Sequence, residues 1–339
     1  MVGQFFRVYR VDDKKGCDMK IESGGNCWVF LWVVLGAAGW LGLLLMVASL
    51  FGCMYQDLQT EEERLGKVTF LDVGQGLAVL MEYDGRYGMF DTGPDSAGVV
   101  DSLLARGIDT LDWVVVSHGH RDHGGGFMEL ASSRGTPQKV LSQEVPSQAL
   151  GLRVFVRNLY VGPDTARSFV GDSVLRLASR YGIPVDTLYR GDVIRLGTSD
   201  GIDLKVLWPP EYVAVGENGA SIVMQGSLRE DPSGNRFLLT GDLDSAGERR
   251  LMELSPDVSA ALLQVPHHGS AGSSSLRFLS QVAPGFAVIS VGAGNSYGHP
   301  REEVLQKLRY VTGDSTAVFR TDRDGTVSFS LVPGVGILR

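Results

Sequence analysis

Cysteine is nearly absent from this 339-residue chain, and its few copies cluster at one end. They are Cys17, Cys27 and Cys53, so no cysteine follows residue 53. That absence excludes a disulfide framework and thiolate metal ligands from the rest of the chain. Positive charge is not in excess either: the formal net charge is −8, which argues against tight, sequence-independent DNA binding through basic surface. Internal repeats and low-complexity segments are also missing, which excludes a repeat array.

Charged residues are missing from a long apolar run between Trp28 and Phe51. A helix of that length extends about 36 Å, whereas the hydrocarbon core of a bilayer is about 30 Å thick. Residues 28–52 are therefore predicted to form a single transmembrane anchor. Lys and Arg are concentrated before the run, so residues 1–27 are predicted to be cytoplasmic and the rest of the chain to lie on the exported side. The basic residues that set this orientation are Arg7, Arg10, Lys14, Lys15 and Lys20.

Two alternatives to a plain anchor arise from the same stretch. A cleaved signal peptide is disfavoured because its apolar core is shorter than this run. A lipoprotein is the other alternative, since residues 50–53 loosely resemble a lipoprotein cleavage site with Cys53 as the lipidated residue, although the bulky Phe51 is unfavourable. Residues 53–66 are predicted to be a polar linker, and residues 67–339 to be one folded domain.

Histidine is confined to three short segments that are rich in Gly or Ser. These segments are 118–123, 267–268 and 299, and together they hold all six histidines. The first segment carries three imidazoles and one carboxylate within six residues. Those are the ligands that a borderline divalent cation takes, so the segment predicts a metal site.

The spacing within the first segment suggests two positions for cations. If the apolar residues just before it form a buried strand, His118 and His120 leave that strand on one face. Asp122 and His123 follow one turn later, so two ligand groups face two adjacent positions, as in a two-metal hydrolase. The glycines at 124–126 are expected to free the backbone to aim these side chains.

Short apolar runs end in a candidate ligand at four places, which are 91, 118–123, 242 and 267. Ligands at the ends of strands, with helices between the strands, predict an α/β sandwich whose site opens along one edge of two packed sheets. The predicted strands are 68–72, 78–83, 87–90, 112–116, 192–196, 204–207, 221–224, 236–240, 261–265, 286–291, 316–319 and 326–331. The predicted helices are 99–106, 174–181, 245–254 and 301–310.

The order of these residues resembles a known superfamily. The pattern His118-x-His120-x-Asp122-His123, followed by Asp242 and His267, is similar to that of metallo-β-lactamase fold hydrolases, which implies a four-layer αββα sandwich. Further motifs resemble the hydrolase domain of the ComEC family of DNA-uptake proteins. These motifs are Phe70-Leu71-Asp72-Val73-Gly74-Gln75-Gly76, Asp91-Thr92-Gly93, Leu239-Thr240-Gly241-Asp242, Val265-Pro266-His267-His268-Gly269-Ser270 and Asn295-Ser296-Tyr297-Gly298-His299-Pro300.

The resemblance implies a ligand set divided between two cations. The implied ligands are His118 and His120 for the first, Asp122, His123 and His267 for the second, and Asp242 as the bridge. The resemblance implies one or two divalent ions, Zn2+ or Mn2+. A middle histidine common in the superfamily is missing, because no histidine occurs from Gly124 to Val265. An oxygen from Asn218 or Ser221 is expected to complete the first shell, and an oxygen-richer shell favours manganese over zinc.

Other residues are assigned roles around the cations. Asp91 is expected to hold a ligand histidine through its second nitrogen, and His268 to lie just outside the ligands or to contact substrate. Asp122 and His299 are the predicted catalytic residues, with His299 donating a proton to the leaving group or holding a phosphate oxygen. Ser270 and Asn295 are predicted to present hydrogen-bond donors to an anionic substrate.

The predicted function is a membrane-anchored, metal-dependent phosphodiesterase or nuclease that acts on single-stranded DNA or nucleotides. Basic residues at 153, 157, 167, 176, 180 and 190 are hypothesised to line the mouth of the site and recruit an anion. One alternative is a hydrolase of the same fold that acts on an ester, lactone or amide. Another is a non-catalytic nucleic-acid-binding domain with a degenerate metal site. ComEC proteins also carry a channel domain and an OB-like domain, for which this chain has no room, so a channel role is not expected.

Overall fold

The computed structural model of the chain describes residues 65–339 except 96, 132–153, 199, 212–217, 230 and 232–235. These residues belong to one compact unit, Thr60–Arg339. The predicted cytoplasmic segment, the predicted anchor and nearly all of the predicted linker lie outside the described residues. Among the helices that are described, none combines the length and the apolar character that a membrane crossing needs.

The first sheet combines strands from the two ends of the described chain. Its strands are β1 (Gly66–Phe70), β2 (Ala78–Tyr83), β3 (Arg86–Thr92), β5 (Trp113–Val116), β7 (Leu159–Val161), β8 (Val185–Thr187), β16 (Val327–Val332) and β17 (Gly336–Leu338). Among the described residues the spatial order is β17, β16, β1, β2, β3, β5, β7, β8. Pairing is antiparallel from β17 to β3 and parallel from β3 to β8.

The second sheet is built from the later part of the chain. Its strands are β9 (Val193–Leu196), β10 (Ile202–Trp208), β11 (Val223–Leu228), β12 (Arg236–Leu239), β13 (Leu262–Gln264), β14 (Phe286–Ile289) and β15 (Val318–Arg320). Among the described residues they lie in the order β15, β14, β13, β12, β11, β10, β9. The strands from β12 to β15 are parallel and the others are antiparallel. A small separate pair joins β4 (Thr110–Leu111) to β6 (Phe155–Val156).

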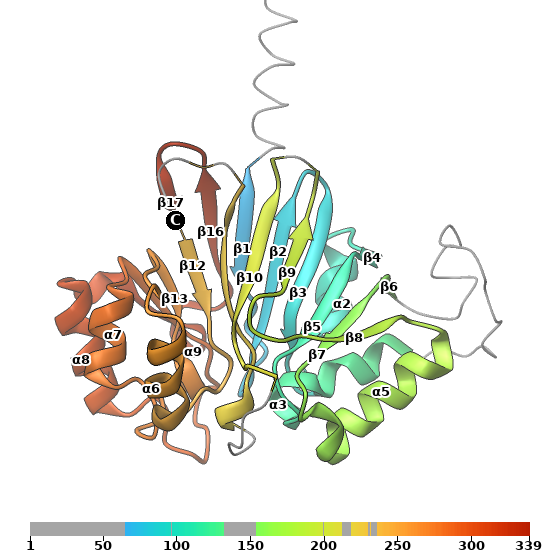
Figure 1. Cartoon of the computed structure of the whole chain (residues 1–339), viewed down its shortest axis with the longest axis horizontal. Coiled ribbons are helices and arrows are strands. Elements are labelled where there is room, and N and C mark those ends of the chain that lie inside the picture. Colours follow the sequence, from blue (N-terminus) through green and yellow to red (C-terminus); the bar gives the residue numbers. More distant parts are fainter. Residues whose placement is uncertain are drawn as a thin grey trace, which may run out of the picture. The chain divides into compact units, whose positions relative to one another are not determined.

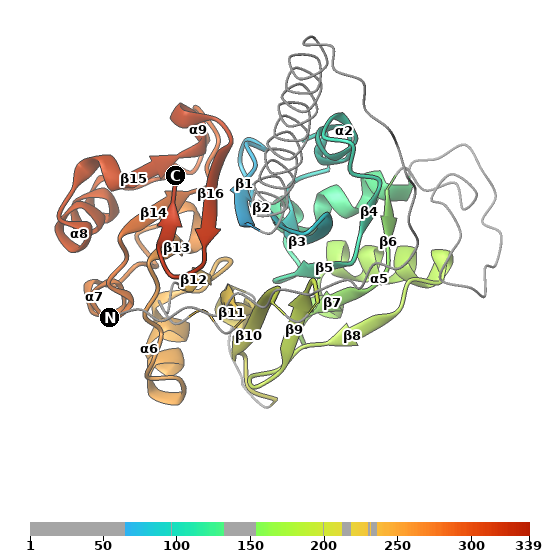
Figure 2. The same ribbon diagram turned by 90° about the horizontal axis from the view of Figure 1, so that it is seen from above.

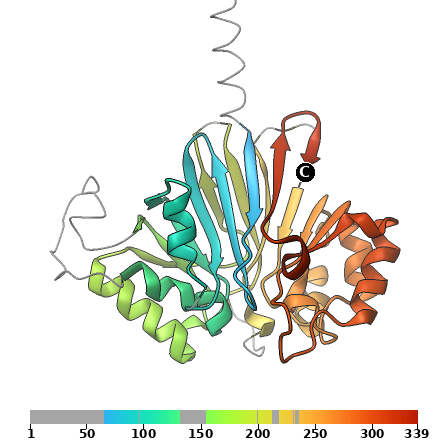
Figure 3. The ribbon, with the colours of Figure 1, turned by 180° about the vertical axis from the view of Figure 1, so that it is seen from behind.

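Helices cover the outer faces of the two sheets. The described helices are α2 (Val99–Ala105), α3 (Arg121–Gly124), α5 (Phe169–Tyr181), α6 (Ser245–Leu254), α7 (Leu276–Val282), α8 (Glu302–Thr312) and α9 (Thr321–Asp324). Figures 1 and 3 show α2, α3 and α5 gathered on one side of the strands and α6, α7 and α8 on the other. Helix, sheet, sheet and helix therefore follow one another, in agreement with the layered sandwich predicted from the sequence.

Three groups of buried apolar side chains hold the layers together. One lies between the sheets and includes Phe70 from β1 and Phe237 from β12. A second packs α2 and α5 on the first sheet, and a third packs α6, α7 and α8 on the second. Seen from above in Figure 2, the strands β9 to β11 run beside the first sheet. Central strands such as β5 and β13 are buried along their whole length, so they are apolar runs that periodicity alone distinguishes poorly from helices.

Local chemistry accounts for several of the element boundaries. The turn between β2 and β3 has Asp84 and Gly85 at φ 50° and 66°, as the Asp-Gly hairpin signal requires. Helix α5 begins where the Ser168 hydroxyl accepts from Gly171 N, and it ends at Gly182 in the left-handed conformation. The strand β2 and the helix α6 have the bounds predicted from the sequence. The helix α7 and the strands β7 and β8 were not predicted, because each is a short run without a decisive period.

Candidate metal centre

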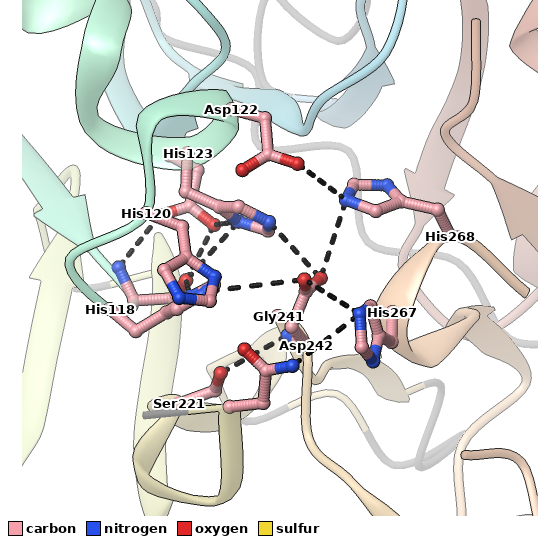
Figure 4. Close-up of polar contacts among 12 residues, drawn as sticks. His118, His120, Asp122, His123, Ser221, Gly241, Asp242, His267 and His268 are labelled. Atoms are coloured by element: carbon pink, nitrogen blue, oxygen red, sulfur yellow. Dashed lines mark hydrogen bonds and ion pairs between the residues drawn. The ribbon is translucent and has the colours of Figure 1, made fainter. Parts of the chain in front are cut away.

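The candidate residues follow the carboxyl ends of two pairs of parallel strands. In the first sheet, Asp91 lies near the end of β3 and His118 follows β5, its parallel neighbour. In the second sheet, Asp242 follows β12 and His268 follows β13, which is also parallel to it. Since parallel strands deliver their carboxyl ends to one edge of a sheet, two packed sheets bring all four side chains to a common edge. Figure 4 shows the resulting cluster.

The histidines from the first sheet are oriented by Asp91 and Ser117. The buried Asp91 carboxylate accepts from Ser117 N, Ser117 Oγ and His123 Nδ1, each at 2.7 Å. Because the Ser117 hydroxyl donates to Asp91, its oxygen is left to accept from His118 Nδ1 at 3.1 Å. Both imidazoles are thereby held with Nδ1 protonated and the Nε2 lone pair free, which is the form that binds a cation.

The glycines after the histidine segment act differently from the expectation. Gly124, Gly125 and Gly126 do not have positive φ, so they are not used for unusual backbone conformations. A Cβ at Gly126 would lie 2.1 Å from Thr92 O, and one at Gly125 would lie 2.7 Å from Asp95 N. These glycines therefore allow α3 and the turn after it to pack against the end of β3, which sets the depth of the cluster.

Asp242 lies at the middle of the cluster, with imidazoles facing both of its oxygens. Oδ1 is 3.1 Å from His123 Nε2 and 3.5 Å from His268 Nε2. Oδ2 is 3.9 Å from His118 Nε2 and 3.6 Å from His267 Nε2. Ser221 Oγ accepts from the Asp242 backbone N at 3.2 Å, so the residue is held by its main chain as well. The buried Asp242 carboxylate therefore faces imidazoles from both sheets.

His267 and His268 occupy places that differ from the sequence expectation. His268 is buried, its Nδ1 donates to Ser290 O at 2.7 Å, and its Nε2 lies 3.4 Å from Asp122 Oδ2. His267 lies outside that group, with Asn218 Nδ2 3.4 Å from its Nε2. Both residues have positive φ, an uncommon and strained conformation that turns the two side chains apart. The structure therefore groups His268, and not His267, with Asp122 and His123.

The donor atoms fit a divalent cation. Two groups of side chains have ligand atoms within 4.8 Å of one another, namely His118, His123 and Asp242, and Asp122, His123 and His268. Among the described residues, His123 Nε2, Asp242 Oδ1 and His268 Nε2 are buried without any hydrogen-bond partner. Buried polar atoms without partners are costly. Their convergence on one point is explained by a cation, and His123 belongs to both groups.

His120 contacts the cluster through His118. Its Nδ1 lies 2.9 Å from His118 Nε2, so two ring nitrogens from alternate residues face each other. This is the convergence that the spacing of the segment predicted. Neither Asn218 nor Ser221, the residues expected to complete the first shell, faces this pair directly. Asn218 faces His267, and Ser221 faces the main chain of Asp242.

The pKa values of the buried groups at the centre of the cluster are shifted in different directions. Burial and the nearby His123 hold the pKa of His118 well below its usual value. Burial also opposes charge on His123, but the carboxylates of Asp242 and Asp91 outweigh it and raise the pKa of His123 well above the usual value. Burial likewise opposes charge on Asp242, but His123 and His268 outweigh it and keep the Asp242 pKa well below the usual range. Asp242 is therefore ionised, and in the absence of a cation His123 also takes up a proton on Nε2.

The predicted proton donor His299 lies beside the cluster. Its ring centroid is 5.8 Å from that of His267 and 5.7 Å from that of Tyr297. Burial and the neighbouring His267 lower the pKa of His299. Asn295 differs from the expectation that it binds substrate, because its amide donates to Gly292 O and His299 O and accepts from His299 N. Its role in the structure is to hold the His299 loop.

Two further expectations about substrate binding have different outcomes. Ser270 Oγ accepts from Gly272 N at 3.3 Å, within its own loop, and its contact with substrate stays a prediction. The basic residues between the ligand groups are mostly engaged elsewhere: Arg157 pairs with Asp112, Arg167 with Asp164 and Arg176 with Asp172. Arg190 donates to Leu254 O and Ser255 Oγ. Three of the described members of this set therefore have carboxylate partners of their own and Arg190 is bound to the main chain, which does not support an anion-recruiting mouth.

Comparison with protein families identifies one match. The model described as Metallo-beta-lactamase superfamily matches residues 71–293. This range includes Asp91, the 118–123 segment, Asp242 and both residues of the His267-His268 pair. It ends within the loop between β14 and α8, before His299.

Two curated relatives match most of the chain. ComE operon protein 3 of Bacillus subtilis is 29% identical over 291 residues, which are 80% of this chain and 34% of that protein. Competence protein ComA of Neisseria gonorrhoeae is 31% identical over 304 residues, which are 88% of this chain and 36% of that protein. The chain therefore spans about a third of the length of these relatives. The resemblance of its motifs to competence proteins is confirmed.

Among solved structures, the metallo-beta-lactamase fold protein YhfI from Bacillus subtilis is similar. Its match covers 78% of this chain and 99% of that chain, with 13% sequence identity and a TM-score of 0.48.

Proposed function

Because this chain belongs to the metallo-β-lactamase superfamily, whose members are generally metal-dependent hydrolases, we propose that it is a metal-dependent phosphodiesterase that cleaves DNA or nucleotides. The observation that carries the proposal is the position of Asp242. Imidazoles face both of its oxygens, and the nearest nitrogens on the Oδ1 side have no hydrogen-bond partner. A carboxylate shared in this way suits two adjacent cations, the arrangement that phosphoryl transfer uses.

The ligands are proposed to divide at the Asp242 carboxylate. Asp122, His123 and His268 would hold one cation on the Oδ1 side, which replaces His267 with His268 in the set expected from the sequence. His118 and His120 would hold the other on the Oδ2 side, where His267 also lies. The donors are nitrogen and oxygen only, which suits Zn2+ or Mn2+.

Bound cations at these positions would lower the pKa of water toward neutrality and neutralise charge on phosphoryl oxygens. The residues of the chain prepare for that chemistry. Asp91 keeps the proton of His123 on Nδ1, and Ser290 O does the same for His268. His299 lies next to His267 at the more exposed side of the cluster, where a leaving group would depart. Its imidazole is proposed to exchange a proton with that group.

The choice of a nucleic-acid substrate rests on the relatives and the motifs. One curated relative is named a competence protein, and the motifs around Asp91, Asp242 and His299 resemble those of DNA-uptake proteins. The net charge of −8 favours recognition at the site itself over tight binding through a basic surface. A single strand is favoured because it brings unstacked bases and one phosphate at a time to the cluster.

The test is hydrolysis by the purified full-length chain. Labelled single-stranded DNA is incubated with the chain in the presence of Mn2+ or Zn2+, and bound metal is counted by elemental analysis. Cleavage that disappears in His120→Ala and Asp122→Ala is the expected result. The matched control is Asp200→Ala, which removes an exposed carboxylate from the turn between β9 and β10. That variant is expected to keep full activity.

Other results would point elsewhere. Turnover of an ester, lactone or amide without DNA cleavage would replace the phosphodiesterase assignment by another hydrolase of the same fold. A purified chain that binds no divalent cation and cleaves nothing would be a binding domain.

We further propose that residues 28–52 anchor the chain in a membrane with the hydrolase domain on the exported side. The support is the uncharged run and the basic residues that precede it. Protease added to intact cells is expected to digest the domain while the N-terminal segment is protected. Full protection of the domain would reverse the orientation, and recovery in the soluble fraction would contradict the anchor.

A further inference from the structure

The loop between β14 and α8 carries an exposed aromatic ring beside the cluster. Tyr297 is 59% exposed, although large apolar surfaces are usually buried. Its ring stacks on that of His299, with centroids 5.7 Å apart and planes 22° apart. His299 is in turn 5.8 Å from the ring of His267, whose Nε2 lies 3.6 Å from Asp242. A continuous series of rings therefore leads from the solvent-exposed Tyr297 to the buried carboxylate.

The same loop is held firmly in place. Asn295 makes three hydrogen bonds to the backbone of Gly292 and His299. Gly292 N donates to Gln75 Oε1 at 3.1 Å, and Arg301 N donates to Gly269 O at 2.9 Å. The loop is thus tied to the β1–β2 connection on one side and to the His267-His268 turn on the other. Its tyrosine is exposed on a fixed support, which lowers the entropy cost of binding a flat ligand.

A cation accompanies the exposed ring. Arg301 is exposed, and its guanidinium donates to Tyr297 O at 3.0 Å. Within the described part of the chain, Arg301 has no ion pair with a carboxylate within 4.0 Å. This differs from Arg157, Arg167 and Arg176, whose charges are neutralised by neighbouring aspartates. A guanidinium that has no carboxylate partner and is held at the backbone carbonyl of an exposed tyrosine is suited to bind a phosphate close to a stacked base.

A second exposed ring lies on the other side of the cluster. Phe169, at the start of α5, is 87% exposed. It follows Ser168, whose Oγ donates to the backbone O of Gly119 at 2.6 Å, between His118 and His120. In Figure 4, His118 and His120 lie on one side of Asp242 and His267 lies on the opposite side. Exposed aromatic rings are therefore attached to both flanks of the candidate centre.

We infer that Tyr297, supported by Arg301, forms a base-stacking subsite for a single-stranded nucleic acid, with Phe169 receiving a base on the opposite flank. This inference rests on the proposed phosphodiesterase function and specifies how the substrate is held. Stacking on an aromatic face tolerates any base sequence, and it compensates for the lack of a net positive surface. The loop from 295 to 301 lies beyond the residues that the superfamily model matches, so the subsite is assigned from the residues of this chain alone.

The test compares strands with and without bases. The full-length chain, supplied with Mn2+, is given an oligothymidylate or an oligomer of the same length made of abasic deoxyribose units. The oligothymidylate is expected to have the lower KM, since only it can stack. Tyr297→Ala is expected to raise that KM by roughly 5- to 150-fold, with little change in kcat, and to leave the KM for the abasic oligomer unchanged. Tyr297→Phe keeps the ring and is expected to behave like the unmodified chain.

A matched control is Tyr310→Ala, because Tyr310 is 75% exposed on α8. This variant should leave both KM values unchanged. Stacking is also measured directly, as quenching of a 2-aminopurine base in the strand after rapid mixing, before turnover. Quenching that survives Tyr297→Ala, or a KM that is equal for the two oligomers, would overturn the subsite.

The two proposals fail in different ways. If neither oligomer is cleaved, the hydrolytic function is wrong, and the quenching assay alone decides whether Tyr297 binds bases. If both are cleaved equally and Tyr297→Ala changes nothing, the hydrolase stands and the subsite is wrong.

Discussion

The candidate centre has an inner, buried part and an outer, partly exposed part, and the histidines of the two parts differ in their hydrogen bonds. In the inner part, formed by His118, His123, Asp242 and His268, each imidazole has an acceptor within 3.1 Å of Nδ1 and is almost fully buried. In the outer part, His267 and His299 are only partly buried, and their Nδ1 atoms are buried without a hydrogen-bond partner among the described residues. Their rings instead contact each other and Tyr297.

This difference separates two tasks. A buried imidazole whose Nδ1 proton is held by an acceptor presents its Nε2 to a cation. A partly exposed imidazole whose tautomer no hydrogen bond fixes is suited to exchange a proton with a substrate. The inner part is therefore expected to control metal affinity and the outer part to control turnover and substrate binding. Each of the following predictions tests that division, in order of decreasing expected effect on metal affinity.

Asp242→Asn is expected to have the largest effect. The amide keeps the volume but loses the charge that both groups of imidazoles face, so metal affinity and kcat/KM should each fall by more than about 100-fold. Asp244→Asn is the control, since Asp244 accepts from Gly247 N as the N-cap of α6 and asparagine caps equally well. Elemental analysis and DNA hydrolysis measure both variants. Full metal content in Asp242→Asn would remove the bridging role.

Asp91→Asn is expected to lower metal affinity by about 10- to 100-fold. Asp91 has φ 58°, a conformation that asparagine tolerates, so the backbone should not change. The amide cannot accept from Ser117 N and from His123 Nδ1 at the same time without presenting its NH2 to one of them. His123 then loses the acceptor that keeps its Nε2 lone pair free. Competition with a metal-binding dye measures the loss, and an unchanged affinity would show that Asp91 serves the turn alone.

Metal affinity is expected to rise with pH by up to about tenfold per unit above the usual histidine pKa. The pKa of His123 is raised by Asp242 and Asp91 against the effect of burial, so a cation must displace its proton. The pH dependence of folding stability has the opposite sign. Protonated His123 stabilises the metal-free chain fully below its unfolded pKa, and that contribution is lost as pH rises through the folded pKa. Metal titrations and urea unfolding between pH 6 and pH 9 measure both, and a flat profile would contradict the assignment.

His299→Gln is expected to leave metal content unchanged and to lower kcat by about 100-fold or more, the range for loss of a general acid or base. Glutamine keeps the polarity and approximate size of the side chain but cannot transfer a proton. A loss of bound metal in this variant would place His299 among the ligands and abolish the distinction between inner and outer parts.

Much of the site was visible in the sequence because its ligands are local. The candidate ligands from His118 to His123 lie within six residues, and the strand before them is an uninterrupted apolar run. The segment and its chemistry could therefore be identified without knowledge of the fold. The ends of β3, β12 and β13 were recognised for the same reason, since each strand stops at a polar residue. Exposed or short elements such as β8 and α7 escaped, because their few residues carry no decisive period.

The choice between His267 and His268 required the tertiary structure. Neighbouring residues have the same sequence signal, and only the left-handed backbone of the turn and the carbonyl of Ser290 decide which ring turns inward. The sequence could not show the ion pairs of the arginines or the hydrogen bonds of Asn295 either. The partner of a side chain depends on which residues the fold brings next to it. Composition and spacing therefore predicted a divalent-cation site made of histidine and aspartate, and the structure brings together side chains that could hold such a cation. Packing of two sheets at a common edge decided which nitrogens face Asp242 and which ring remains exposed beside the cluster.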